Sequence, residues 1–166
     1  MPDLDLYQGY GMTESSAVLT ALGPDDHRAG GARLHSAGRA LYGVVLSIQD
    51  DDGNALPTGQ TGEVCARGGN FMREYWNNPE ATEEAFHGGW YHSGDAGYLD
   101  ERGYLFLVDR VKDMIVTGGE NVYSVEVENA IAAHPAVAQV AVIGIPHDVW
   151  GEAVHAVVVA RDGMEV

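Results

Sequence analysis

The sequence DRVKDMI at residues 109–115, followed by GGENVY at residues 118–123, decides the fold of this chain. A strand-like run over residues 104–108 leads into the first stretch and places Arg110 at its end. Side chains that favour β structure lie on both sides of Gly118-Gly119. The pattern predicts a hairpin at the two glycines and, just before it, a junction between two structural modules.

The composition is that of a globular protein. Of the 166 residues, 45% are hydrophobic, and this length is enough to bury a core. The 22 glycines indicate many turns and close backbone approaches. A single cysteine, Cys65, excludes an internal disulfide, and its place in a strand-like run predicts a small buried side chain rather than a nucleophile.

The charge narrows the classes of partner. The formal net charge is -16 at pH 7, with 9 Lys and Arg against 25 Asp and Glu. Nucleic acids and anionic membrane surfaces are bound by clustered basic side chains, so neither is expected as a partner. No apolar run approaches the length of a membrane span, and no signal peptide opens the sequence. We therefore expect no membrane span and a cytoplasmic location.

Short strands with glycine-rich turns are expected before the junction. Residues 41–49 and 62–67 form a candidate hairpin around the acidic turn at 50–54, and a second hairpin joins residues 95–100 to 104–108. These elements predict a distorted antiparallel β sheet or barrel subdomain.

Three further elements are expected in the same half. Residues 4–7 resemble a short strand, and residues 20–38 resemble an irregular surface segment because of their glycines and aspartates. Residues 78–86 are typical of a short helix, in which Asn78 is the N-cap and Pro79 takes the first helical position.

After the junction the pattern changes. The hairpin is followed by helical spacing over residues 125–132, and then by β-rich runs at 137–145 and 153–160. We expect Ser124 to cap the helix and Glu152 to be a structural or solvated carboxylate. The fold class is therefore α+β: the sheet or barrel subdomain, followed by a small α+β domain of hairpin, helix and strands.

Single motifs leave alternatives open. The turn from Tyr10 to Glu14 (YGMTE) presents backbone amides, a hydroxyl and a carboxylate to an anion with its metal, or it is simply a helix start capped by Thr13. Asp95, between glycines, is an ordinary turn residue or an acceptor for a vicinal diol such as ribose. The seven histidines show no metal-ligand spacing, and His92 stays unassigned.

The motifs in combination carry a resemblance. Tyr-Gly-Met-Thr-Glu, then Ser-Gly-Asp, then Asp-Arg-x-Lys-Asp with a Gly-Gly-Glu-Asn loop resembles the signature of the AMP-dependent acyl-CoA synthetases, including the fatty-acid–CoA ligases, of the adenylate-forming (ANL) superfamily. The resemblance runs from about Leu4 to the end of the chain.

The resemblance implies roles around a nucleotide. Tyr10 and Gly11 would pack along the adenine, and Thr13 would contact the adenylate phosphate. Glu14 would bind Mg²⁺, which makes Thr13 and Glu14 the implied catalytic residues. Asp95 and Arg110 would hold the ribose hydroxyls.

The same resemblance implies moving parts after the junction. Lys112, the only lysine of the chain, would occupy a hinge. The loop of Gly118, Gly119 and Glu120 would enter the site after adenylation and line the tunnel for the CoA pantetheine.

The implied domain boundary lies at 109/110. Residues 1–109 would be the C-terminal part of the large domain, β-rich from about residue 35, and residues 110–166 the start of a truncated small domain. The phosphate loop of the family is expected upstream of Tyr7, and its adenylation lysine downstream of Val166. The chain is therefore interpreted as an internal fragment that is inactive alone.

The implied function is that of an ATP-dependent carboxylic acid–CoA ligase of the fatty-acid type, with ATP, Mg²⁺, CoA and a small carboxylic acid as partners. Loading of a carrier-protein pantetheine is an alternative, and so is a non-catalytic binding or scaffold module. The acid and the oligomeric state stay open.

Overall fold

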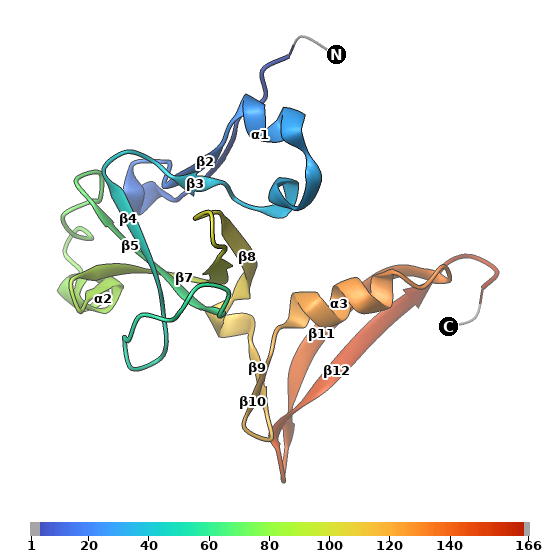
Figure 1. Cartoon of the computed structure of the whole chain (residues 1–166). Coiled ribbons are helices and arrows are strands. Elements are labelled where there is room, and N and C mark those ends of the chain that lie inside the picture. Colours follow the sequence, from blue (N-terminus) through green and yellow to red (C-terminus); the bar gives the residue numbers. More distant parts are fainter. Residues whose placement is uncertain (1–3, 165–166) are drawn as a thin grey trace. The chain divides into compact units, whose positions relative to one another are not determined.

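The computed structural model describes residues 4–164 and divides into two compact units, Met1–Leu107 and Val108–Val166 (Figure 1). Each unit has its own sheets and is described by itself. The division after Leu107 lies two residues before the boundary placed from the sequence. The described residues contain no helix of the length and apolarity that a membrane span requires.

The first unit is built mainly of short antiparallel strands. Its strands are β1 (Gln8–Tyr10), β2 (Thr20–Leu22), β3 (Arg39–Ala40), β4 (Val44–Gln49), β5 (Gly62–Gly68), β6 (Phe86–His87), β7 (Trp90–Leu99) and β8 (Leu105–Arg110), the last of which runs past the division. Its helices are α1 (Pro24–Ala29) and α2 (Pro79–Ala85), with 3-10 turns at Thr13–Ser15 and Gly31–His35.

Two sheets share this unit. The order β1-β2-β3 makes a three-stranded sheet, and β4-β5-β7-β6 with β8 beside β7 makes a five-stranded one (Figure 1). Ile48, Val64, Leu105 and Ala37 form the buried cluster beneath the larger sheet. Burial of such side chains is the main favourable term in folding, at about 25 cal/mol per Å² of apolar surface. The expected antiparallel sheet is confirmed.

Helix α2 begins where the sequence predicts. The Asn78 side chain accepts a hydrogen bond from the Ala81 backbone N–H at 3.2 Å, and Pro79 is the first helical residue. This cap satisfies one of the amide donors that a helix start leaves without a partner.

Two expectations for the N-terminal segment are wrong. The strand lies at Gln8–Tyr10 rather than at residues 4–7. Residues 20–38 are not an irregular surface segment, because they contain β2, α1 and a 3-10 turn, and Leu22 and Ala37 are buried. Their glycines mark the ends of short elements rather than a disordered loop.

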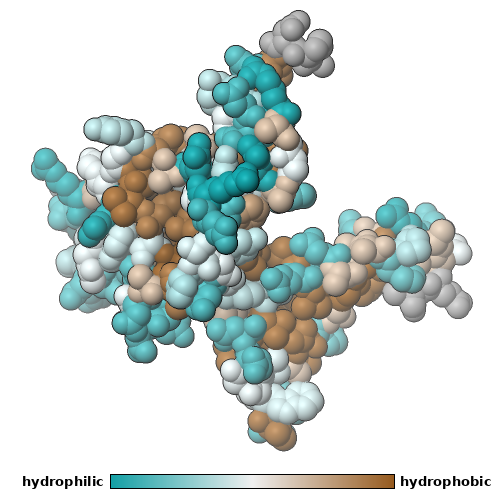
Figure 2. All heavy atoms as spheres, in the orientation of Figure 1, coloured by the Kyte–Doolittle hydropathy of each residue, from teal (hydrophilic) through white to brown (hydrophobic). Residues whose placement is uncertain are grey.

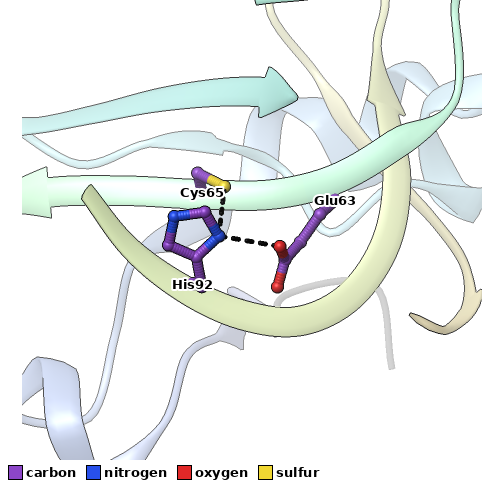
Figure 3. Close-up of side chains that lie close together, drawn as sticks. All are labelled: Glu63, Cys65 and His92. Carbon is purple, nitrogen blue, oxygen red and sulfur yellow. Dashed lines mark hydrogen bonds and ion pairs between the residues drawn. The ribbon is translucent and has the colours of Figure 1, made fainter. Parts of the chain in front are cut away.

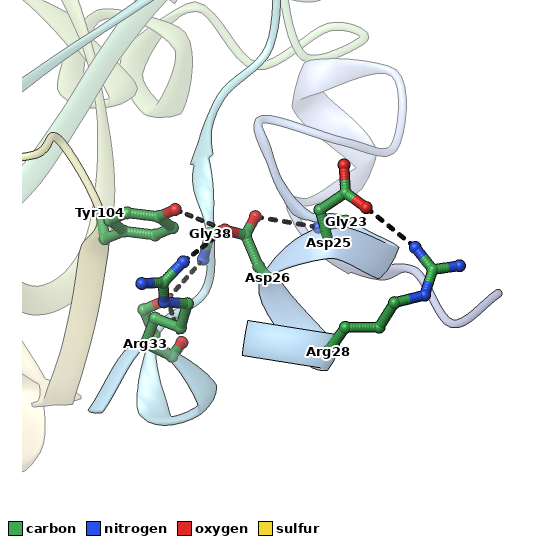
Figure 4. Close-up of polar contacts among 8 residues, drawn as sticks. Gly23, Asp25, Asp26, Arg28, Arg33, Gly38 and Tyr104 are labelled. Atoms are coloured by element: carbon green, nitrogen blue, oxygen red, sulfur yellow. Dashed lines mark hydrogen bonds and ion pairs between the residues drawn. The ribbon is translucent and has the colours of Figure 1, made fainter. Parts of the chain in front are cut away.

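Asp26 on α1 ties this segment to the sheet (Figure 4). Its Oδ1 accepts a hydrogen bond from the Tyr104 hydroxyl at 2.5 Å and lies 3.5 Å from Arg33 Nη1, while its Oδ2 accepts from the Gly23 N–H at 3.4 Å. The Tyr104 hydrogen bond, with the nearby arginines, lowers the pKa of Asp26 against the opposing effect of desolvation. A charged carboxylate therefore anchors α1.

The second unit is a small α+β arrangement. Its elements are a 3-10 turn at Val111–Asp113, β9 (Ile115–Thr117), β10 (Glu120–Val122), α3 (Ser124–Ala132), β11 (Val137–His147) and β12 (Gly151–Ala160). The strands form one antiparallel sheet in the order β10-β9-β12-β11. The expected succession of hairpin, helix and strands is confirmed, and with it the α+β class.

Asp109 provides the cap of α3. Its Oδ2 accepts hydrogen bonds from the Ser124 hydroxyl at 2.7 Å and from the Val125 N–H at 3.2 Å. Burial raises the pKa of Asp109, but these hydrogen bonds and one from the Arg110 N–H outweigh it and leave the pKa below its ordinary value. The expectation that Ser124 caps the helix is wrong, because Ser124 is the first helical residue and the carboxylate accepts from the amide instead.

One face of the long β11–β12 ribbon is apolar and open. Val142 is buried, whereas Ile143, Ile145, Val157 and Val159 are exposed on the opposite face, since their positions alternate along paired strands. Figure 2 shows hydrophobic surface in brown over β11 and β12.

Candidate functional site

The turn from Tyr10 to Glu14 admits only glycine at position 11. A Cβ added to Gly11 would lie 2.0 Å from the Ala17 carbonyl oxygen, far inside contact distance. The Leu19 N–H donates to the Tyr10 carbonyl at 2.8 Å, which closes the loop. The alternative of a helix start is realised only as a single 3-10 turn at Thr13–Ser15. Thr13 is exposed on this turn.

Tyr10 and Asp95 lie together although 85 residues separate them. The Tyr10 hydroxyl donates to Asp95 Oδ2 at 2.6 Å, and Asp95 is 8% exposed. A hydrogen bond to a carboxylate at this length is a strong, charge-assisted one. The fold thus brings together two of the residues that sequence reasoning placed at the nucleotide.

Asp95 lies within strand β7 rather than in a turn, and Glu63 on β5 holds the stretch of β7 just before it. Its Oε1 accepts from the Gly94 N–H at 2.9 Å, and the Asp95 N–H donates to the Ser93 hydroxyl at 3.1 Å. Sequence reasoning missed Glu63. It stands 31 residues before Gly94, and no local spacing shows that β5 and β7 are neighbours.

Glu14 is held by a second aromatic hydroxyl. The Tyr75 hydroxyl donates to Glu14 Oε1 at 2.8 Å, and the Met72 N–H donates to the Glu14 carbonyl at 2.7 Å. Burial, followed by the hydrogen bond to Glu14, raises the pKa of Tyr75 above its ordinary value. A partly exposed carboxylate fixed in this way has the hard oxygen ligands that Mg²⁺ prefers.

The remaining candidates belong to the second unit. Arg110 and Lys112 are exposed, the first at the end of β8 and the second on the 3-10 turn that follows. The structure therefore gives the first unit a hydrogen-bonded pair, Tyr10 and Asp95.

The glycine pair forms the tip of a two-residue hairpin. Thr117 pairs with Glu120, and the φ angles of Gly118 and Gly119 are 61° and 88°. Positive φ at both central positions defines a type I′ turn, which glycine adopts without strain. Gly118, Gly119 and Glu120 are all exposed.

The base of that hairpin is fastened to β12. Glu152 Oε2 accepts from the Val116 N–H at 2.8 Å, and the Gly118 N–H donates to the Trp150 carbonyl at 3.0 Å. A Cβ on Gly144 would lie 2.6 Å from Glu152 Oε1, so glycine at that position leaves room for the carboxylate. Glu152 is structural, as the sequence analysis expected.

Comparison with known proteins identifies the family. The pattern of the family described as "AMP-binding enzyme" matches residues 1–76, and that of "AMP-binding enzyme C-terminal domain" matches residues 126–166. The chain belongs to the adenylate-forming, AMP-binding enzymes.

Three relatives illustrate the range of the family. Fatty acid–[acyl-carrier-protein] ligase ScoC of Streptomyces coeruleorubidus is 45% identical over 98% of this chain and 31% of its own length. Long-chain-fatty-acid–CoA ligase FadD13 of Mycobacterium tuberculosis is 45% identical over 95% of this chain and 31% of its own length. Feruloyl-CoA synthase of an Amycolatopsis species is 42% identical, over 98% of this chain and 33% of its own. The chain thus spans about a third of these relatives.

Solved structures agree with the fold. ATP-bound MatB from Rhodopseudomonas palustris matches with a TM-score of 0.86 and 40% identity, over 97% of this chain and 31% of that one. The amide bond synthetase McbA from Marinactinospora thermotolerans matches with a TM-score of 0.83 and 45% identity, over 97% of this chain and 33% of that one. At these values the α+β fold is that of the adenylate-forming enzymes.

Proposed function

We propose that this chain is part of an ATP-dependent carboxylic acid–CoA ligase that forms an acyl-adenylate and then a thioester. The observation that carries the proposal is the Tyr10–Asp95 hydrogen bond at 2.6 Å, because it gathers two nucleotide candidates from distant parts of the first unit. The naming of relatives as acid–thiol ligases supports it.

The first unit would bind the adenylate. Tyr10 and Gly11 pack along the adenine, and the exposed Thr13 hydroxyl meets the phosphate. Asp95 accepts hydrogen bonds from the ribose hydroxyls. The resemblance to the family assigns Arg110 to the ribose as well. A vicinal diol suits a fixed carboxylate because both hydroxyls donate to it.

Charge control is the main catalytic demand on these residues. A carboxylate that attacks the α-phosphate of ATP needs alignment and charge stabilisation more than covalent help. Glu14 would hold Mg²⁺, which supplies positive charge beside the polyphosphate when bound. In a chain of net charge -16, the remaining positive charge would come from Arg110 and from backbone amides of the turn at Gly11.

The second unit would serve thioester formation. The two half-reactions need different surroundings for the same carbonyl carbon, and a rotation about Lys112 would provide each in turn. The hairpin of Gly118, Gly119 and Glu120 would then line the pantetheine tunnel, where a bare backbone permits close approach. We accordingly assign residues 1–109 to a large domain and residues 110–166 to a small one.

The acid is proposed to be of the fatty-acid type, after the relatives with that name. The name of the Streptomyces relative favours a second candidate, transfer to a carrier-protein pantetheine instead of free CoA. Thioester formation by the complete protein with free CoA, against formation with a pantetheinylated carrier protein, separates the two.

The nucleotide assignment is tested in the complete protein by AMP binding. Asp95→Asn and Arg110→Ala should each weaken AMP binding about tenfold or more, since each removes a charged hydrogen bond to the ribose. If AMP affinity is unchanged in both variants, the ribose assignment is wrong. A scaffold module without a nucleotide site would show no AMP binding even before substitution.

A polypeptide limited to these 166 residues should not turn over. Its sequence has no glycine- and Ser/Thr-rich phosphate loop upstream of Tyr7, and Lys112 is its only lysine. Loss of one group that stabilises transition-state charge costs about 10²–10³ in rate. Clear ATP–pyrophosphate exchange by this polypeptide alone would refute the expectation.

A further inference from the structure

Three side chains with metal-binding chemistry converge between β5 and β7 (Figure 3). Cys65 and His92 face each other across the paired strands, and Glu63 lies two residues before Cys65. Cys65 Sγ is 3.4 Å from His92 Nδ1, and Glu63 Oε2 is 2.7 Å from the same nitrogen. One potential ligand atom from each residue lies within 4.8 Å of the others.

The geometry excludes a nucleophilic Cys–His–Glu triad. Such a triad needs the thiol at one imidazole nitrogen and the acid at the other, whereas Cys65 and Glu63 both contact Nδ1. Burial, followed by the charge of Glu63, raises the pKa of Cys65 to about 12, which is the opposite of activation. As the sequence analysis expected, Cys65 is a buried side chain.

The spacing instead approaches that of a tetrahedral metal site. With zinc–sulfur and zinc–nitrogen bonds of about 2.3 and 2.05 Å, tetrahedral ligands place sulfur and nitrogen about 3.6 Å apart. The Cys65–His92 distance of 3.4 Å is close to this. For a nitrogen and an oxygen ligand the expected separation is about 3.3 Å. The distance between Glu63 Oε2 and His92 Nδ1 is shorter, 2.7 Å, because these two atoms share a proton in a hydrogen bond. A small rotation of the Glu63 carboxylate, whose side chain is 24% exposed, would lengthen this distance.

An ion could reach this point from outside. Glu63 and His92 line a surface cavity of about 390 Å³ that is also lined by Asp50, Asp51 and Asp52. Carboxylates at such a mouth raise the local concentration of cations. The imidazole of His92 is nine-tenths buried, and its Nε2 has no hydrogen-bond partner among the described residues.

We propose that Glu63, Cys65 and His92 form a binding site for a zinc-like divalent cation, with an oxygen, a sulfur and a nitrogen ligand and the fourth position open to the cavity. On binding, the thiol proton leaves to solvent and the imidazole proton moves from Nδ1 to Nε2. The cation takes the place of the proton between the three atoms. Because Glu63 also accepts from the Gly94 N–H, the ion would fix the stretch of β7 just before Asp95. The proposal stands independently of the proposed ligase function.

The single cysteine makes the test specific. Co²⁺ is added to the 166-residue chain, and any thiolate-to-cobalt charge-transfer absorption can arise only from Cys65. We expect one Co²⁺ per chain, displaced by Zn²⁺, with a band that Cys65→Ser abolishes. His92→Gln and Glu63→Gln should each weaken Co²⁺ binding at least about tenfold. His155→Ala, at an exposed histidine of β12, should leave it unchanged.

Circular dichroism of each variant checks that it is folded. If Cys65→Ser does not fold, the Co²⁺ affinity of His92→Gln still tests the site. The proposal is overturned if the folded chain shows no thiolate–cobalt band with excess Co²⁺. It is also overturned if a band appears but His92→Gln leaves the Co²⁺ affinity unchanged.

Discussion

In the first unit, Tyr10, Asp95 and Glu14 are held by hydrogen bonds, whereas the candidate residues of the second unit are exposed. Asp95 is 8% exposed and bonded to Tyr10, and Glu14 accepts the hydroxyl of Tyr75. In the second unit, by contrast, Lys112 and the hairpin tip at residues 118–120 are exposed. The difference is in how much of each side chain's geometry the fold determines.

That difference matches two functional demands, binding by groups fixed in advance and entry of a moving segment into a site. A group that must hold a ribose or a metal gains from being fixed in advance, because its alignment costs nothing at the moment of reaction. A segment that enters a site for only one half-reaction must be able to leave it, and glycines at its tip keep it narrow. In the second unit the Glu152 carboxylate holds the base of the hairpin, and the Gly118 N–H donates to the Trp150 carbonyl.

The largest expected effect is at the fastened turn. Gly11→Ala places a Cβ 2.0 Å from the Ala17 carbonyl oxygen, so the backbone of the turn must shift. A displacement of about 1 Å can cost about 10²-fold in rate, so ATP–pyrophosphate exchange by the complete protein should fall by at least that factor. Gly69→Ala, where an added Cβ meets nothing within 4 Å, is the matched control. Equal activity of the two variants would contradict a fixed turn.

A smaller effect, on one half-reaction, is expected at the hairpin tip. Gly119→Ala forces alanine to a φ of 88°, a strain of about 1–2 kcal/mol. Thioester formation by the complete protein should fall about tenfold while ATP–pyrophosphate exchange is unchanged. Gly163→Ala carries a similar strain, at a φ of 76° in the same unit, and should affect neither step. If Gly119→Ala also lost ATP–pyrophosphate exchange, the assignment of the hairpin to thioester formation alone would be wrong.

The hydroxyl that holds Glu14 should matter less. Tyr75→Phe keeps the ring and removes the 2.8 Å hydrogen bond to Glu14. Since such a bond contributes about 0.5–1.5 kcal/mol, the Mg²⁺ concentration that gives half-maximal exchange should rise about two- to tenfold. An unchanged Mg²⁺ requirement in Tyr75→Phe would argue against Glu14 as the metal ligand.

The smallest effects concern acid stability and compare the units directly. The pKa values of Asp26, in the first unit, and Asp109, in the second, are both lowered in the folded state. Their contribution is therefore present above their ordinary pKa, near pH 4, and is lost as the pH falls through the lower folded value. Asp26→Asn and Asp109→Asn should each reduce stability at pH 7 and weaken its loss toward pH 3.

Urea unfolding at several pH values measures this dependence. Asp51→Asn, at the exposed turn after β4, is the control and should leave the profile unchanged. A variant at Asp26 or Asp109 that keeps the full acid sensitivity of the parent chain would contradict the assigned cause.

Local sequence patterns predicted the structural features that depend on residues close together along the chain. The hairpin at Gly118-Gly119, the Asn78 cap and the α+β order follow from turn chemistry and periodicity, and the structure confirms them. Residues 20–38 were misjudged because Asp26 acquires its role only from Tyr104, 78 residues further along the chain. The fold supplies that partner, and short-range composition cannot.

The candidate site shows the same limit. The motif order indicated Tyr10 and Asp95, but not that their side chains bond each other. Glu63 carries no motif and becomes visible only when β5 and β7 pair and bring it to His92 and Gly94. Asp109, which caps α3, was passed over for the Arg110 beside it.

The most direct test of the account is a double-mutant cycle on AMP binding by the complete protein, with Tyr10→Phe, Asp95→Asn and the pair. We predict that Asp95→Asn weakens AMP binding about tenfold or more, and that Tyr10→Phe then costs much less than it does with Asp95 intact. The coupling should be about 1 kcal/mol or more. Unchanged AMP affinity in Asp95→Asn, or strictly additive losses, would contradict the claim that this linked pair holds the nucleotide.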